Sequence, residues 1–408
     1  MGRHERWFTR SLLAAVFMGW GTAMAAESEA FEPVLVVVNP YAHVDWDTYD
    51  HHRAALHVHT LQSDGYHMVD EVVRAYHGAG FTILSITDHD NNAPNLRVEM
   101  GEVPEEEASP YPLDPKPDGF PHQPTWPWTD YGGPDPAELG MVGIEGNELS
   151  LQHHANSYFN DYGAPATELS DEEQLRELRG VQEREGLMIW NHPHWPARPP
   201  RQPVAWYQNH FEQFDHLIGM EITNCGEAEE PYTEGLWDQL LARLMPERPV
   251  WGFGNDDMHA LNNARETYTV FPLGELTIEA VRDAMEQGQF YFHKANRTWD
   301  VREGEEAMSR FPVIERIAVD NEAGTITIEA SDYDIIRWIS APESLEPVAD
   351  ITESNAPHPL GRVVHEGETI AYRETPGVAH YVRAELHRTE NGRIHRTFTN
   401  PFGIGMVR

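Results

Sequence analysis

Cysteine and lysine are the two residue types that this chain almost lacks. Cys225 is the only cysteine among 408 residues, so no disulfide can form within the chain. Thiolate-based structural zinc sites are disfavoured for the same reason. Lys116 and Lys294 are the only lysines, and with the arginines they make 29 basic residues against 67 acidic ones, a formal net charge of −38. So acidic a chain repels nucleic acids and anionic membranes, and we expect it to bind neither.

A long hydrophobic run is also missing, and this determines how the N-terminus is interpreted. The apolar stretch "SLLAAVFMGW" spans only residues 11–20, which is too short to cross a membrane. Arg3, Arg6 and Arg10 precede it, and the small residues of "GTAMAA" follow it. The pattern is typical of a cleavable secretory signal peptide, here residues 1–26, and a buried N-terminal helix is the alternative. We therefore expect a periplasmic or secreted protein.

Strand and helix patterns alternate from residue 27 to about residue 305. Helices are predicted over residues 68–80, 170–186, 234–245 and 276–288, with short apolar strands before and after each. This alternation predicts an α/β fold with a parallel sheet, most simply a closed or nearly closed β/α barrel. The pattern then changes to short strands of period two, separated by turns such as "NEAG" and "ENGR". This change predicts a small β-sandwich-like domain over residues 306–408.

Residues 93–139 interrupt the alternation. The segment is rich in proline, acidic residues and aromatics, so it forms neither a long helix nor an interior strand. Long connections of this kind are usually functional or disordered. One hypothesis is a lid whose Trp126 and Trp128 contact a substrate, and the alternative is a surface insertion packed by its own aromatics.

Histidines and carboxylates gather where the predicted strands end. The clusters are His57, His59 and Asp64; Asp88, His89 and Asp90; Glu148, His153 and His154; His192 and His194; and Asp256, Asp257 and His259. Barrel enzymes build their sites at the C-terminal ends of strands, so we expect these clusters to meet. Residues i and i+2 of a strand point to the same side, so His57 and His59 can bind one ion together. Imidazoles with carboxylates suit zinc, manganese or iron, and two or three ions bridged by Glu148 would use all these ligands.

The ordered motifs "HVHTLQSDG", "ITDHD", "GNELS", "HAN", "NHP" and "NDDMH" resemble those of the PHP (polymerase and histidinol phosphatase) metallohydrolases. The resemblance covers roughly residues 50–300 and implies a distorted (β/α)7 barrel. It also implies nine metal ligands: His57, His59, Asp64, His89, Glu148, His154, His192, Asp257 and His259. Asp64 stands where some members carry a histidine, which puts the occupancy of a third ion in question. More weakly, an exported barrel with a C-terminal β domain resembles the branch of carbaryl-type carbamate ester hydrolases.

The resulting hypothesis is metal-assisted hydrolysis of a small-molecule ester by a di- or trinuclear centre. The ions would lower the pKa of a bridging water, and the hydroxide would attack phosphorus or a carbonyl carbon. Asp90 or His194 would serve the leaving group. Arg198 and Arg201 would bind a substrate anion, unless they belong to a solvated loop.

A phosphoesterase is the preferred function, because most PHP proteins hydrolyse phosphate esters. A carboxyl or carbamate ester hydrolase and a non-catalytic exported metal-binding protein are the alternatives. The residues do not predict the oligomeric state.

Overall fold

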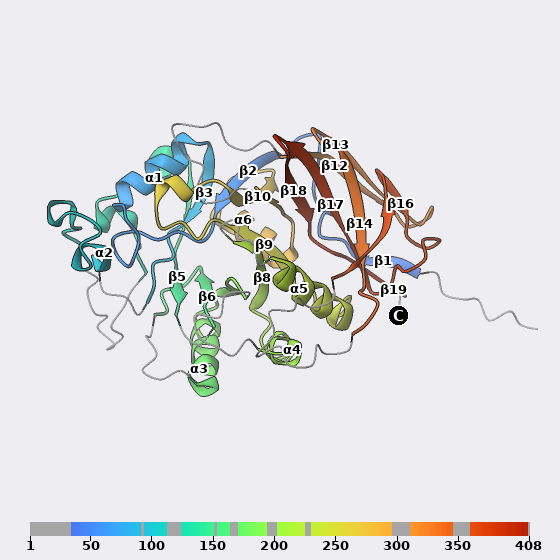
Figure 1. Ribbon diagram of the computed structural model, residues 1–408, viewed down its shortest axis with the longest axis horizontal. Coiled ribbons are helices and arrows are strands. Elements are labelled where there is room, and N and C mark those ends of the chain that lie inside the picture. Colours follow the sequence, from blue (N-terminus) through green and yellow to red (C-terminus); the bar gives the residue numbers. More distant parts are fainter. Residues whose placement is uncertain are drawn as a thin grey trace, which may run out of the picture. The chain divides into compact units, whose positions relative to one another are not determined.

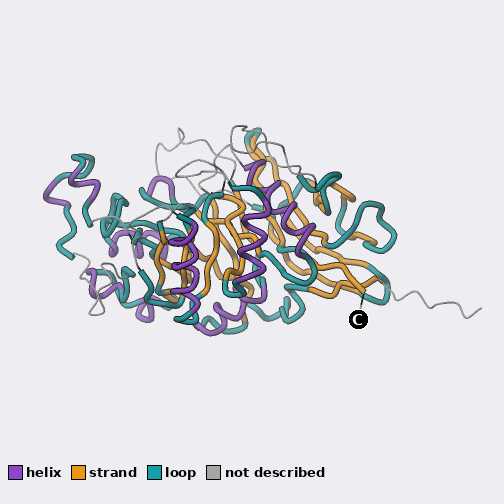
Figure 2. The backbone as a smooth tube through the Cα atoms, turned by 90° about the horizontal axis from the view of Figure 1, so that it is seen from below, coloured by secondary structure: helices purple, strands orange, loops and turns teal. Residues whose placement is uncertain are grey.

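The structure is a computed structural model that describes residues 34–90, 94–111, 124–150, 153–163, 170–193, 202–224, 230–295, 311–345 and 360–406. The predicted signal peptide lies outside the described residues. The fold is mixed α/β, with several sheets and comparatively little helix, as Figure 2 shows. None of the described helices is long and apolar enough to cross a membrane.

Two sheets carry the first part of the chain (Figure 1). One contains β2 (Asp50–Ala55), β3 (Phe81–Ser85), β4 (Val142–Ile144), β10 (Thr267–Leu273) and β11 (Tyr291–Lys294). The other has five strands in sequence order: β5 (Gly146–Leu149), β6 (Ala155–Tyr158), β7 (Leu187–Trp190), β8 (Leu217–Asn224) and β9 (Trp251–Asn255). The pairs β2–β3, β3–β4, β7–β8 and β8–β9 are parallel, as the alternation of strands and helices predicts.

The expected closed (β/α)7 barrel is not seen among the described residues. β4 and β5 follow each other directly in the chain but belong to different sheets, and β5 pairs antiparallel with β6. The strands therefore make two adjoining sheets rather than one closed ring. The α/β class is confirmed at this coarser level.

Four of the six described helices correspond to predicted segments, and the second and fourth were not predicted. The six helices are α1 (Val69–Gly78), α2 (Leu96–Glu99), α3 (Asp171–Gln182), α4 (Val204–Gln213), α5 (Glu230–Leu244) and α6 (Ile278–Gln287). In α1, Val69, Val72, Val73 and Tyr76 recur at helical spacing, and all four are buried in the core. α3 begins at Ser170, whose side chain accepts a hydrogen bond from the Glu173 N–H at 3.3 Å, as its capping sequence predicts.

Eight strands are described in the C-terminal part; the first, second and fifth of them form a sheet of their own, and the other five extend the first sheet. The eight strands are β12 (Val313–Asp320), β13 (Thr325–Ser331), β14 (Ile335–Ser340), β15 (Arg362–Glu366), β16 (Thr369–Ala371), β17 (Tyr381–Glu390), β18 (Arg393–Thr399) and β19 (Phe402–Met406). β18 pairs antiparallel with β11, and β19 pairs with β1 (Val34–Val38) near the start of the described chain. The predicted domain boundary at residues 305–306 lies outside the described residues and stays a prediction.

A buried ionic contact joins α5 to these strands. The Arg383 guanidinium contacts Asp238 through Nε at 2.9 Å and Nη2 at 3.0 Å, and both side chains are almost fully buried. Arg383 Nη1 also lies 2.7 Å from Glu385 Oε1. These contacts fix the C-terminal strands against the helix that follows β8.

Candidate metal centre

The predicted ligands stand where strands of the two sheets end. His57 and His59 follow β2, His89 follows β3, Glu148 lies in β5, His154 precedes β6, His192 follows β7, and Asp257 and His259 follow β9. Isolated β-bridges join Val58 to Met258 and His89 to Glu148. Backbone pairing between the sheets thus brings the ligands together even though no barrel closes.

Ligand atoms from eight residues fall into three overlapping groups, and within each group all atoms lie within 4.8 Å of one another. The groups are His59, Asp64, His89 and His259; His57, His59, Glu148 and Asp257; and His89, Glu148 and His154. His59, His89 and Glu148 each belong to two groups, as expected of residues that lie between neighbouring ions. His192, the ninth predicted ligand, adjoins them with Nε2 3.3 Å from Glu148 Oε1.

The geometry of the most buried group fits metal coordination better than hydrogen bonding. Glu148 Oε2 lies 3.1 Å from His57 Nε2 and 3.2 Å from His59 Nε2. These three atoms are buried, yet none of them has a hydrogen bond of acceptable geometry. Buried polar atoms are nearly always hydrogen-bonded, so the exception requires an explanation. Atoms that converge on a common point, rather than on each other, are arranged as ligands around an ion.

Two of the nine residues adopt backbone conformations that are rare for their residue types. The φ angle of His192 is 23° and that of Asp257 is 49°, both in the range that favours glycine. Such conformations persist where the surrounding structure enforces them, and they concentrate at functional sites. Here they occur at the ends of β7 and β9, in the turns that place the two side chains beside Glu148.

The ionisable groups of the centre shift one another's pKa values in both directions. Burial lowers the pKa of His57 and His59, but Asp257 and Glu148 outweigh it and raise both, that of His59 to about 10, so a bound ion would have to displace these protons. Burial opposes ionisation of Glu148, but the surrounding histidines outweigh it and hold the Glu148 pKa well below its usual value. Burial lowers the pKa of His89 to about 3, so this imidazole is neutral at pH 7. Ionised carboxylates and neutral imidazoles are the forms that bind divalent ions.

Glu221, in the middle of β8, supports the centre and is absent from the predicted ligands. Its side chain is fully buried, and Oε1 lies 2.7 Å from His57 Nδ1. Oε2 accepts the backbone N–H of His192 at 2.8 Å. A carboxylate on the second nitrogen of a metal-ligating histidine fixes the ring orientation and raises its basicity. The one signal in the sequence was a charged residue within the otherwise uncharged strand "HLIGMEITN".

Asp88 holds the loop that follows His59, and among the described residues its hydrogen bonds go to Thr60, Ser63 and Thr125 rather than to a ligand histidine. Its Oδ1 accepts from the Thr60 N–H and the Ser63 hydroxyl, each at 2.7 Å. Its Oδ2 accepts from the Thr60 hydroxyl at 2.7 Å and from the Thr125 hydroxyl at 2.6 Å. Asp88 therefore positions the loop of Asp64 and connects the 93–139 insertion to it.

Of the residues predicted for proton transfer and anion binding, only Asp90 lies in the described part of the chain. Asp90 is buried beside the centre, where Oδ1 accepts the Ser150 N–H at 3.1 Å, and its role in proton transfer stays a prediction. His194, Arg198 and Arg201 lie outside the described residues.

The expected substrate contact by Trp128 is not supported. Its side chain is completely buried in the core, and its ring meets that of Trp126 edge-on at 5.6 Å. Trp126 is half-buried and packs against the same core. The two aromatics therefore anchor this end of the insertion by packing, which agrees with the alternative given above.

Comparisons with known proteins identify similar structures only. No family model matches the chain, and no curated protein matches it. A two-domain protein from Bacteroides vulgatus that contains a PHP-like metal-dependent phosphoesterase is 14% identical, covers 90% of this chain and 97% of its own, and has a TM-score of 0.47. A protein described as a metal-dependent phosphoesterase, from Bifidobacterium adolescentis, is 14% identical over 57% of this chain and 96% of its own, with a TM-score of 0.34. An amidohydrolase from Chromobacterium violaceum is 12% identical over 51% of this chain and 87% of its own, with a TM-score of 0.30.

The description of the Bacteroides vulgatus protein as PHP-like agrees with the resemblance stated from the sequence motifs. None of these three proteins is described as a carbaryl-type hydrolase. At such identities and TM-scores the likeness carries no argument about activity, which depends on the site itself.

Proposed function

We propose that the protein is a metal-dependent hydrolase that cleaves phosphate esters with two or three divalent ions. The observation that carries the proposal is the convergence of eight ligand residues into three groups that share His59, His89 and Glu148. Zinc, manganese or iron bound there would supply an acidified water and neutralise the negative charge that develops in the transition state.

The residues of the chain would provide the orientation. Glu148 lies between two groups and would hold neighbouring ions at a fixed separation. Glu221 and Asp88 would keep His57 and the Asp64 loop in place through the contacts described above. A preorganised site of this kind loses little energy to rearrangement when charge develops on the reacting group.

Access to the centre supports an enzyme rather than a closed metal store. The His259 side chain is 25% exposed and that of Asp64 16%, whereas His57 is fully buried. One side of the centre therefore opens to solvent, and structural metal sites are usually closed. A phosphate ester is preferred over a carbamate because a multinuclear centre suits the charge of a phosphoryl group.

A substrate panel tests the proposal. The protein, stripped with a chelator and reloaded with manganese or zinc, is assayed with p-nitrophenyl phosphate, bis-p-nitrophenyl phosphate and an aryl carbamate. We expect metal-dependent release of nitrophenol from a phosphate ester, with His43→Gln, an exposed histidine far from the ligands in sequence, as a control. Hydrolysis of the carbamate alone would select the alternative, and hydrolysis of none would favour the non-catalytic metal-binding protein.

Export is a separate part of the proposal, supported by the charge and apolar pattern of residues 1–26. Mass spectrometry of the mature protein from its native host should find an N-terminus near Ala25 or Ala26. An intact Met1 on the mature protein would contradict it.

A further inference from the structure

Arg97, in the short helix α2 of the 93–139 insertion, lies at the open side of the candidate metal centre. The insertion docks on the ligand loop through consecutive contacts: Asn95 N–H to Leu61 O at 2.7 Å, and Leu96 N–H to Ser63 O at 3.4 Å. Arg97 continues the series, with Nε donating to the backbone oxygen of Asp64 at 2.5 Å. The insertion thus delivers a permanent positive charge to the residue that completes one metal-ligand group.

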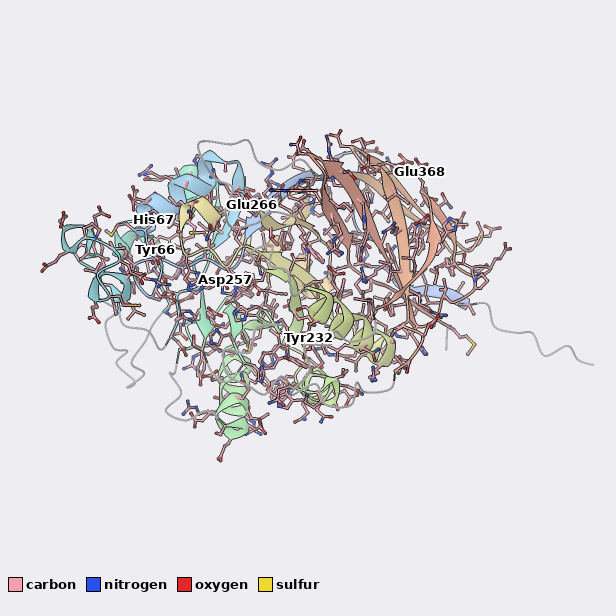
Figure 3. All side chains as sticks on the ribbon, viewed as in Figure 1. Tyr66, His67, Tyr232, Asp257, Glu266 and Glu368 are labelled. Atoms are coloured by element: carbon pink, nitrogen blue, oxygen red, sulfur yellow. The ribbon has the colours of Figure 1, made fainter. Side chains whose placement is uncertain are left out.

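The guanidinium is held on three sides. Nη1 donates to Glu102 Oε2 at 3.1 Å, and the plane lies over the Tyr66 ring, with Cζ 4.7 Å from its centroid. The Tyr66 hydroxyl donates to the same Glu102 oxygen at 2.7 Å, so it holds this carboxylate in place. Tyr66 belongs to the centre's surroundings, because its N–H donates to His259 O at 2.8 Å. Figure 3 labels Tyr66 and Asp257. A guanidinium fixed in this way is preorganised for a further partner.

The remaining nitrogen, Nη2, lies 3.9 Å from Oδ2 of the ligand residue Asp64, which is beyond hydrogen-bond distance. Among the described residues, Nη2 has no hydrogen bond. On its other side, Asp64 Oδ2 lies 3.3 Å from His259 Nε2. Nη2 therefore lies beside Asp64, one member of the group formed by His59, Asp64, His89 and His259, on the exposed side where a substrate would enter.

We propose that Arg97 is a substrate-binding residue whose Nη2 donates a hydrogen bond to a non-bridging oxygen of a phosphoryl group held at the His59–Asp64–His89–His259 group. Arg97 would then favour phosphate monoesters, which carry the most negative charge, over diesters and over neutral carbamates. This inference rests on the proposed function for the kind of reaction, but it concerns anion binding and can be measured without turnover.

The experiment measures the binding of inorganic phosphate to the full-length, metal-loaded protein by isothermal titration calorimetry. Arg97→Gln is expected to raise the Kd for phosphate about tenfold or more, the scale on which one charge-assisted hydrogen bond acts. Arg97→Lys keeps the positive charge but loses the planar guanidinium. Its Kd for phosphate should lie between those of wild type and Arg97→Gln. Arg74→Gln is the matched control, because Arg74 is exposed on α1 and forms a surface ion pair with Asp70 at 2.7 Å.

Two further measurements distinguish direct phosphate binding by Arg97 from an indirect effect in which Arg97 only holds Asp64 in place. Metal content per chain should be the same in wild type and Arg97→Gln, and KM for p-nitrophenyl phosphate should rise more than kcat falls. A phosphate Kd within twofold of wild type overturns the inference, as does a loss of affinity explained entirely by lost metal. If the wild-type protein hydrolyses the substrate but Arg97→Gln leaves the phosphate Kd unchanged, the inference about Arg97 is wrong and the proposed function stands. If the phosphate Kd depends on Arg97 but the protein hydrolyses no phosphate ester, the proposed function is wrong and the inference about anion binding stands.

Discussion

Replacing Glu148 with glutamine tests the shared use of ligands in the centre. Glu148 Oε2 lies 3.1 Å from His57 Nε2 and 3.2 Å from His89 Nδ1, and Oε1 lies 2.9 Å from His154 Nδ1. The carboxylate therefore belongs to two of the three ligand groups. Glutamine has nearly the same size but no charge, and it is a poor bridge between two ions.

The size of the effect follows from the ligands that remain. The group of His89, Glu148 and His154 would keep two imidazoles, fewer than the three protein ligands usual for a catalytic zinc ion. The group of His57, His59, Glu148 and Asp257 would keep three ligands. We therefore expect Glu148→Gln to bind one ion fewer per chain and to lose roughly 10³-fold in kcat, the upper range for removing one preorganised electrostatic contributor.

The assay combines plasma emission spectrometry of dialysed protein with turnover of p-nitrophenyl phosphate. Circular dichroism confirms that the variant is folded, and Glu329→Gln in the exposed part of β13 serves as a control for loss of one acidic charge. Full metal content together with more than half of the wild-type activity in Glu148→Gln would refute the shared role of this residue.

Three further changes test buried carboxylates outside the predicted ligand set. Glu221→Gln removes the carboxylate 2.7 Å from His57 Nδ1 and should weaken metal affinity about 10–100-fold in a chelator competition, whereas an affinity within twofold of wild type would contradict this role. Burial raises the pKa of Glu177 well above its usual 4.5, so the folded state keeps a proton that the unfolded state loses, and the contribution of Glu177 to stability falls as pH rises above about 4.5. Urea titrations of Glu177→Gln and wild type should therefore show a difference in unfolding free energy, variant minus wild type, that increases from pH 4.5 to pH 8. A difference that stays constant over this range would disprove the raised pKa of Glu177. Asp238→Ala leaves Arg383 buried without its bidentate partner and should cost about 3–5 kcal/mol of stability, with a change below about 1 kcal/mol arguing against the buried contact.

Much of the centre was predictable from the sequence because its ligands follow strands. His57 with His59 shows the i, i+2 spacing of a strand, and His89 and His192 each end an apolar run. Such local patterns can be read from the sequence regardless of which strands pair with each other. The structure accordingly brings together all nine residues that the resemblance implied.

The parts that were not predictable depend on contacts between distant segments. Strand and helix alternation does not determine that β4 and β5, one residue apart, join different sheets, or that β18 pairs with β11. Glu221 was a lone carboxylate in a strand, and its meaning appears only when β8 lies beside the His57 turn. Arg97 was one arginine in a proline-rich insertion, and its contact with Asp64 depends on how that insertion docks.

The central claim is that hydrolysis depends on ions held by the three ligand groups. The most direct measurement removes the metal with a chelator and follows phosphate ester turnover while manganese or zinc is added back in known molar amounts. The account predicts negligible turnover in stripped protein and recovery that saturates at two to three ions per chain. Undiminished turnover by protein with less than about 0.1 ion per chain would contradict it, since every role assigned to the ligands requires bound metal.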